Sequence, residues 1–258
     1  MNTKEEINSL KKAGGNYRIF ALVVVSLILA VTGYGCSNGS NFGSGTIVSE
    51  ERSVNDFDSV FVRGEGTVYL TQGEAVSVVV ETDDNLIRKV YTEIRDGTLE
   101  LRYASGLFGT HLRPTQGYIY HITVVDLENV SIEGSAEVFA DSVVVERLDL
   151  DVTGSGQVDI DDLKADEVRA NITGSSEIKL SGVADTQEIS VTGSGTFDGQ
   201  DFEGKYVEVS CKGSVSVTVW ATVDLDVSLA GEGEIKYYGD VVPDMSNGSG
   251  TVQSLGDR

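Results

Sequence analysis

The sequence predicts an all-β protein built around a right-handed parallel β-helix, and three observations support this prediction. The first is a repeat near the C-terminal half, in which a glycine, usually followed by serine, recurs every 17 to 20 residues. The seven pairs are Gly134-Ser135, Gly154-Ser155, Gly174-Ser175, Gly193-Ser194, Gly213-Ser214, Gly231-Glu232 and Gly248-Ser249. Such a period is typical of repeat architectures, in which each unit buries its apolar side only against its neighbours.

The second observation is a set of apolar columns in fixed positions around the glycine. Two places before it stand Ile132, Val152, Ile172, Val191, Cys211 and Leu229, and four places after it stand Val138, Val158, Ile178, Phe197, Val217, Ile235 and Val252. A further column, four places before the glycine, begins with Val130 and Leu150, and the residues between the columns are mostly polar. An apolar spacing of two indicates strands with one buried face.

The third observation is where glycine and proline occur in the chain. Glycine adopts positive φ without steric cost, so the Gly-Ser-Gly segments suit sharp corners between short strands. Only two prolines, Pro114 and Pro243, interrupt the chain, as expected where backbone ladders run through most of it. We therefore expect about seven coils of about 20 residues. An antiparallel sandwich or barrel is the alternative, but its loop lengths usually vary more.

The N-terminus predicts export. Lys11, Lys12 and Arg18 precede an apolar run over residues 19–31, which is short for a membrane-spanning helix. Cys36 follows small residues and precedes a Ser/Gly/Asn-rich stretch, so residues 1–36 resemble a bacterial lipoprotein signal with Cys36 as the lipid-attachment site. Gly33 departs from the leucine that is usual there. Simple cleavage, or an uncleaved anchor helix, are the alternatives.

The rest of the chain divides into three segments. Residues 37–52 form a flexible linker, 53–126 a strand-rich N-terminal part, and 127–258 the β-helix coils with a C-terminal cap. In the second segment, Gly64-Glu65-Gly66 is followed by alternating apolar residues and looks like a displaced copy of the later repeat. We expect this segment to lead into the solenoid and close its open end, because a bare terminal coil would promote aggregation.

Three stretches of the sequence carry a family resemblance. They are DFDSVFVRGEGTVYLTQGEAVSVVVETDDNLIRKV, TEIRDGTLELRY and YIYHITVVDLENVSIEGSAEV, and they are followed by the Gly-Ser-Gly coils. Together they resemble the putative autotransporter-adhesin head GIN domain over about residues 53–240. The resemblance implies a β-helical exported domain of the bacterial cell envelope. The family name suggests adhesion, and the resemblance assigns no catalytic residues.

Composition and side-chain placement favour a non-enzymatic role. The net charge of −22 argues against nucleic acid as a partner and against electrostatic docking to anionic membranes. Carbohydrate-active β-helix enzymes, such as polysaccharide lyases and hydrolases, need clustered acids with arginine or lysine beside them. Here the outward acids are spread along the repeat without arginines beside them, so such an enzyme is kept only as the alternative. His111 and His121 lack further metal-ligating residues at suitable spacing, and we expect neither a metal nor a cofactor. Cys211 stands in an apolar column and is expected to be buried and unpaired.

One pair of aromatic residues suggests a binding surface. Trp220 and Tyr238 both follow their glycines by seven places, so they are expected to lie on adjacent coils about 4.8 Å apart. This pair is a candidate surface for a sugar or a protein; the alternative is that it packs beneath the C-terminal tail. The sequence thus predicts an adhesin-like or scaffold module, anchored at the membrane, with an envelope or extracellular protein or glycan as partner. A signalling role and homo-oligomers, as trimers or end-to-end stacks, are also compatible with it.

Overall fold

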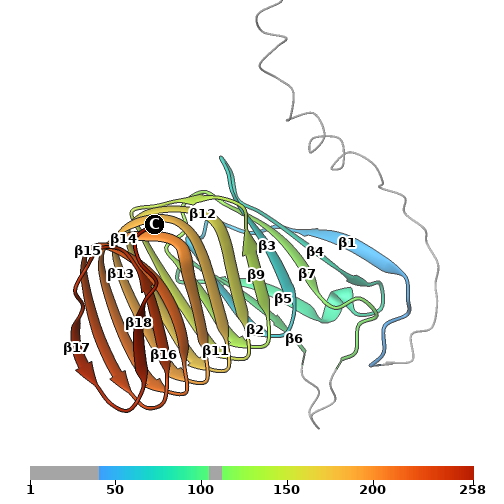
Figure 1. Ribbon diagram of the computed structural model, residues 1–258. Coiled ribbons are helices and arrows are strands. Elements are labelled where there is room, and N and C mark those ends of the chain that lie inside the picture. Colours follow the sequence, from blue (N-terminus) through green and yellow to red (C-terminus); the bar gives the residue numbers. More distant parts are fainter. Residues whose placement is uncertain (1–40, 105–111) are drawn as a thin grey trace, which may run out of the picture. The chain divides into compact units, whose positions relative to one another are not determined.

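The computed structural model describes residues 41–104 and 112–258, and this part of the chain is a parallel β-solenoid of about six turns (Figure 1). The all-β class and the parallel β-helix are therefore confirmed. The last glycine unit, around Gly248, contributes only the short strands β17 (Asp244–Asn247) and β18 (Thr251–Ser254). The predicted anchor helix, Cys36 and His111 lie outside the described residues. Within the described ranges, no helix has the length and apolar character needed to cross a membrane.

The solenoid has two long faces. The first face consists of strands that end at the repeat glycine: β2 (Ser59–Gly64), β8 (Asn129–Gly134), β11 (Arg147–Gly154), the later parts of β12 (Gln157–Gly174), β13 (Glu177–Gly193), β14 (Thr196–Gly213) and β15 (Ser216–Ala230), and β17. The second face consists of strands that follow the glycine: β3 (Thr67–Gln72), β9 (Glu137–Ala140), the first residues of β12 to β15, β16 (Glu234–Tyr238) and β18. The short strand β10 (Val143–Val144) pairs with β12 on the return segment between the faces.

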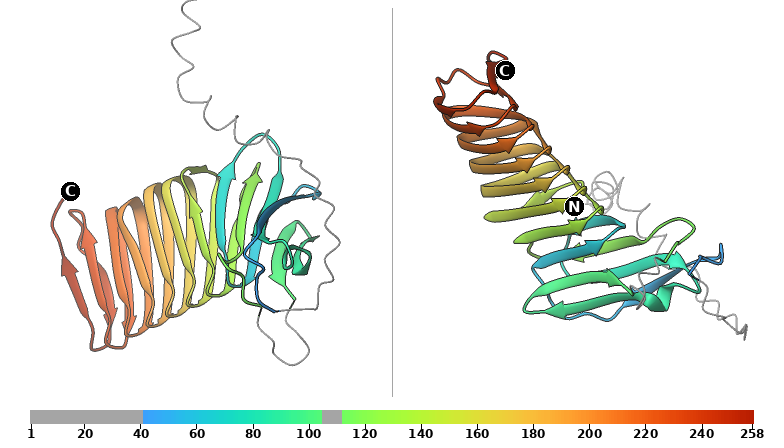
Figure 2. Two further views of the ribbon diagram at one scale, coloured as in Figure 1. Left: turned by 90° about the vertical axis from the view of Figure 1, so that its right-hand side faces the viewer. Right: turned by 90° about the horizontal axis from the view of Figure 1, so that it is seen from below.

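Equivalent residues of successive coils lie in register. Ile132 pairs with Val152, Val152 with Ile172, and Ile172 with Val191, and all four side chains are buried. The predicted vertical column of apolar side chains is thus present, and Figure 2 shows the coils stacked one on another. Cys211 extends the same column, is 1% exposed, and has no disulfide partner in the described residues. Its burial confirms the expected role as a small core residue.

The corners between the two faces depend on glycine. Gly154 has φ of 117°, and a Cβ placed on it would lie 2.5 Å from the carbonyl oxygen of Gly134. The same carbonyl accepts a hydrogen bond from the backbone N–H of Ser155 at 2.8 Å. The ladder between coils therefore continues around the corner, and no larger residue fits there without moving the coil beneath it.

The N-terminal segment contributes both a coil and a cap. Gly64 of β2 pairs with Gly134 of β8, so the displaced copy of the repeat predicted around Gly64 is real. The cap elements are β1 (Ile47–Arg52), β4 (Ser77–Asp83), the 3₁₀ helix η1 (Ile87–Lys89), β5 (Val90–Arg95), β6 (Thr98–Tyr103) and β7 (Ile119–Val124). Strands β6 and β7 extend the two faces in parallel, whereas β1, β4 and β5 add antiparallel pairs.

The two ends of the solenoid differ in how they are closed. At the cap, Leu86, Ile87 and Tyr120 are buried beneath the first coil. At the other end, the apolar columns finish at Met245, which is 48% exposed, and at the partly buried Val252. The cap end therefore has a sealed apolar interior, whereas the last coil leaves part of its inward surface in contact with water.

Candidate binding surfaces

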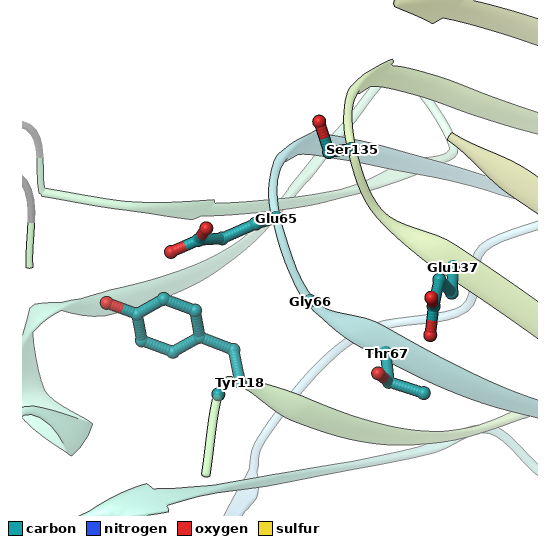
Figure 3. A pocket seen from close by; sticks show the side chains of 7 residues that line it. Glu65, Gly66, Thr67, Tyr118, Ser135 and Glu137 are labelled. Carbon is teal, nitrogen blue, oxygen red and sulfur yellow. The ribbon is translucent and has the colours of Figure 1, made fainter. Parts of the chain in front are cut away.

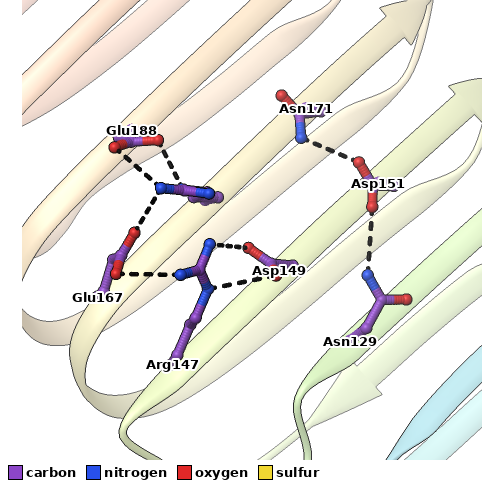
Figure 4. A network of polar contacts seen from close by, with 8 residues as sticks. Asn129, Arg147, Asp149, Asp151, Glu167, Asn171 and Glu188 are labelled. Atoms are coloured by element: carbon purple, nitrogen blue, oxygen red, sulfur yellow. Dashed lines mark hydrogen bonds and ion pairs between the residues drawn. The ribbon is translucent and has the colours of Figure 1, made fainter.

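The outward side chains of the first face form ion-pair and hydrogen-bond rows across the coils (Figure 4). Asp151 accepts hydrogen bonds from the side-chain amides of Asn129 and Asn171, at 3.2 and 2.9 Å. A second row alternates charge: Arg147 pairs with Asp149 and Glu167, and Arg169 pairs with Glu167 and Glu188. These carboxylates are engaged by neighbouring amides and guanidinium groups. The row orders a flat polar surface and contributes little stability, because exposed ion pairs are weak.

Two hollows lie where the cap meets the first coils. The hollow shown in Figure 3 has a volume of about 230 Å³ and is lined by Glu65, Gly66, Thr67, Gly117, Tyr118, Ser135 and Glu137. The second, of about 380 Å³, lies on the first face beside Phe61 and Thr98 and extends over Asn129, Ser131, Ile132, Glu133, Asp151 and Thr153. The first is smaller than a typical small-molecule site, which encloses about 300 to 1,000 Å³, and the second lies at the low end of that range.

The tyrosines beside the first hollow belong to the cap. Tyr118 stacks on Tyr103 with ring centroids 4.9 Å apart, and its side chain is buried. Burial raises the pKa of the Tyr118 phenol well above its ordinary value, and the negative charge of Glu65 acts in the same direction. Within the part of the chain that the structure describes, the Tyr118 hydroxyl has no hydrogen-bond partner. Figure 3 shows the Glu65 carboxylate on the side of the Tyr118 ring, away from Glu137. Burial raises the pKa of both Tyr103 and Tyr118, so the two phenols are neutral and packed, and we assign them to closing the solenoid.

A buried carboxylate fixes the start of the described chain on this cap. Asp83 accepts hydrogen bonds from the backbone N–H of Gly45 and from both the backbone N–H and the hydroxyl of Thr115, at 2.7 to 2.8 Å. Desolvation pushes the pKa of Asp83 upward, but these hydrogen bonds together outweigh it and hold the pKa below its ordinary value. Asp83 therefore joins Gly45, which lies within the predicted linker, to the loop before β7.

The pair predicted as a binding surface lies side by side as expected. Trp220 of β15 and Tyr238 of β16 are paired residues on neighbouring coils of the second face. The guanidinium of Arg258 lies 5.3 Å from each ring centroid and also contacts Asp201 and the carbonyl of Gln200. The structure thus places the C-terminal residue over the pair, which is the packing alternative stated above. Ligand binding by the pair remains a prediction.

The structure also brings together an aromatic row that the sequence analysis missed. Tyr69 of β3 lies between His121 of β7 and Phe139 of β9, with ring centroids 5.4 and 5.9 Å apart and ring planes within 26° of parallel. The three residues are paired across adjacent parallel strands and point outward from the second face. A signal was present, because Tyr69 and Phe139 both stand five places after Gly64 and Gly134. His121, for which the sequence predicted no metal-binding role, carried no such signal.

The described residues hold no group of three or more His, Cys, Asp or Glu side chains arranged to bind a metal ion. The chemistry that these surfaces offer is therefore that of aromatic rings, amides, hydroxyls and paired carboxylates on flat sheets. Such groups suit recognition of another molecule by contact and hydrogen bonding.

Comparison with known proteins gives a family match and a fold match. The model of the family described as "Putative auto-transporter adhesin, head GIN domain" matches residues 56–241. A crystal structure described as a putative adhesin from Bacteroides fragilis superposes with a TM-score of 0.74 at 23% identity, covering 84% of this chain and 96% of that one. No curated protein matches this chain.

Two further solved structures share the fold. One, described as a putative lipid binding protein from Parabacteroides distasonis, has a TM-score of 0.68 at 25% identity and covers 83% of this chain and 98% of that one. The other, described as a putative adhesin from Parabacteroides merdae, has a TM-score of 0.66 at 21% identity with the same coverage. Because identities this low establish shared fold alone, the ligands of these proteins cannot be transferred on this basis.

Proposed function

Because the chain belongs to the putative auto-transporter adhesin, head GIN domain family, we propose that it is a non-enzymatic binding module of the bacterial envelope. Family membership indicates an exported, envelope-associated protein with an adhesin-like β-solenoid. The proposal adds that the solenoid works by presenting an outward face to a partner.

The observation that carries this proposal is the exposed aromatic row on a rigid sheet. Tyr69 is 46% exposed although it lies in the middle of a paired strand between two further rings. Aromatic side chains are the residues most enriched at the energetic centres of binding surfaces. The ladder beneath the row holds its backbone in place, so binding would cost little ordering.

We further propose that the module is held at the membrane through Cys36. The basic, apolar and small-residue order of residues 1–36 supports a lipoprotein signal, and the described part begins only a few residues later. Mass spectrometry of the mature protein from envelopes tests this. A diacylated Cys36 at the new N-terminus supports the anchor, whereas an unmodified Cys36 contradicts it.

The binding function is tested on whole cells. A strain lacking the protein is complemented with the full chain carrying either the wild-type sequence, Tyr69→Ala or Tyr206→Ala, and attachment to biofilm and to extracellular-matrix coatings is measured under flow. We expect the wild type and Tyr206→Ala to restore attachment and Tyr69→Ala to fail. Attachment that is the same in all strains, including the deletion, would contradict the proposal. Polysaccharide turnover by the purified chain, abolished at one outward acid, would favour the enzyme instead.

A further inference from the structure

We propose that the aromatic row formed by His121, Tyr69 and Phe139, together with the adjoining Asp159, is a subsite for a neutral glycan chain. This inference rests on the proposed binding function and adds the surface and the chemical class of the ligand.

The row is continuous across four coplanar strands. Strands β7, β3, β9 and β12 are neighbours in the second face, and Figure 1 labels the first three side by side. His121 pairs with Tyr69, Tyr69 with Phe139, and Phe139 with Asp159. Adjacent strands are about 4.8 Å apart, so the four side chains extend over roughly 14 Å, enough for two to three sugar rings.

The aromatic part of the row supplies apolar contact together with polar groups. The rings of Tyr69 and His121 are exposed, and Phe139 is half-buried beside them. The three rings stack face to face, so a sugar would place its apolar C–H surface against their outward edges, and its hydroxyls need hydrogen-bond partners. The Tyr69 phenol can donate and accept a hydrogen bond, and the His121 imidazole adds ring nitrogens.

Asp159 supplies an acceptor at the end of the row. Its Oδ2 atom lies 3.4 Å from the ammonium group of Lys179, but its Oδ1 atom is buried and has no hydrogen-bond partner among the described residues. A buried carboxylate oxygen without a donor is costly. The Asp159 side chain as a whole is 20% exposed, and a glycan hydroxyl at the end of the row would donate to this exposed part of the carboxylate.

The charges around the row select against an anionic ligand. Glu137 lies two residues before Phe139 on β9, where it pairs with Thr67. Asp159 is the last residue of the row, and its carboxylate already binds Lys179. The whole chain carries a net charge of −22. A uronate or sulfate group would therefore be repelled, whereas a neutral sugar chain, rich in hydroxyl donors, meets acceptors.

The other aromatic pair is less suited to this role. Arg258 lies over both Trp220 and Tyr238 and is itself tied to Asp201, so a ligand would have to displace it. The row around Tyr69 carries no such side chain among the ring and cation contacts of the described residues.

The test uses the full chain in detergent and a panel of neutral hexasaccharides of glucose, mannose, galactose and N-acetylglucosamine, with hexauronates and a hexalysine peptide as further probes. Binding is measured by titration calorimetry for wild type, Tyr69→Ala, Asp159→Asn and Tyr206→Ala. Tyr206 is a matched control because it is 53% exposed and lies outside the row. We expect a neutral hexasaccharide to bind, and Tyr69→Ala to weaken it about tenfold or more while Tyr206→Ala leaves it unchanged.

Three results would overturn the inference: no neutral hexasaccharide binding at millimolar concentration, equal binding by wild type and Tyr69→Ala, or binding of hexalysine in preference to every sugar. Circular dichroism and thermal unfolding confirm that each variant is folded. If cells still attach through Tyr69 in the flow assay while no sugar binds, the glycan is wrong and the binding function stands. If attachment also fails to depend on the protein, both proposals fail.

Discussion

Gly64 pairs with Gly134 in the parallel ladder, although the cap strands β4 to β7 lie between them in the sequence. The chain therefore builds β2 and β3, forms the cap strands β4 to β7, and returns to place β8 directly on β2. This return brings Tyr69 against Phe139 and creates the aromatic row.

The first prediction concerns this glycine contact. A Cβ on Gly134, which has φ of 136°, would lie 2.2 Å from the Gly64 carbonyl oxygen. We expect Gly134→Ala to lower the free energy of unfolding by at least about 2 kcal/mol, because strain and overlap add. Gly117→Ala is the control, since it also has positive φ but meets nothing within 4 Å. Urea unfolding measures both; an equal loss in the two variants would refute the close approach.

The second prediction concerns the buried Asp83. Removing its carboxylate leaves the donors of Gly45 and Thr115 without their partner. We expect Asp83→Ala to cost about 2 kcal/mol or more of stability near neutral pH. The exposed neighbour Asp84, which accepts from the Ser44 hydroxyl, serves as the matched control, and Asp84→Ala should cost much less. Equal urea midpoints for the two variants would contradict the assigned role.

The same carboxylate predicts a pH dependence. Because the folded-state pKa of Asp83 lies below its ordinary value of 3.8, the unfolded state binds the proton more readily. The stabilisation is present above pH 3.8 and is lost as the pH falls through the folded pKa. The stability difference between wild type and Asp83→Ala should therefore shrink below that pH. A difference that stays constant into stronger acid would show that Asp83 is not ionised in the folded state.

A third prediction concerns the reactivity of Cys211. Burial raises the pKa of its thiol to about 12, from an ordinary value of 9.0. Because the thiolate is the reactive form, alkylation of the folded protein at pH 8 should be roughly a thousandfold slower than that of the unfolded chain. Peptide mass spectrometry separates Cys211 from Cys36. Comparable labelling of Cys211 in folded and unfolded protein would place it outside the core.

A fourth prediction concerns the C-terminal arginine. Trp220 is the chain's single tryptophan, and Arg258 lies over its ring. We expect Arg258→Ala to shift the tryptophan emission to longer wavelength, because the indole gains contact with water. The loss of stability should be under about 1 kcal/mol, since the contact is partly exposed. Lys236→Ala, which removes a neighbouring cation paired with Glu234, should leave the emission unchanged. An unshifted spectrum in Arg258→Ala would mean that the tail does not cover Trp220.

Most of the fold could be predicted from the sequence because each coil repeats the same local rule. The alternation that ends at Ile132 and Val152, and the glycine that follows it, fix strand, inward face and corner within one unit. The pairing of Trp220 with Tyr238 followed from the same repeat, because both residues stand seven places after their glycines. The cap could not be predicted in this way, because its antiparallel strands β1, β4 and β5 belong to no repeat and their pairing is decided by long-range burial.

The aromatic row shows where the alignment of positions relative to the repeat glycine was not carried far enough. The resemblance of Gly64 to the later glycines was visible, and extending it by five residues places Tyr69 over Phe139. His121 could not be placed, because β7 joins β3 only after the chain has passed through the cap. The packing of Arg258 on Trp220 depends on the path of the last residues, which carry no periodic signal.

The most direct test of the account is a pair of cysteines that joins the first coil to the second. Thr67→Cys and Glu137→Cys, introduced together with Cys211→Val, occupy paired outward positions of β3 and β9, where parallel neighbours lie within disulfide reach. Thr71→Cys with Glu137→Cys is four residues out of register. We predict that mild oxidation links the first pair nearly completely and leaves the second unlinked. No link in the first pair, or equal linking in both, would contradict the stacking of β3 on β9 and remove the aromatic row with it.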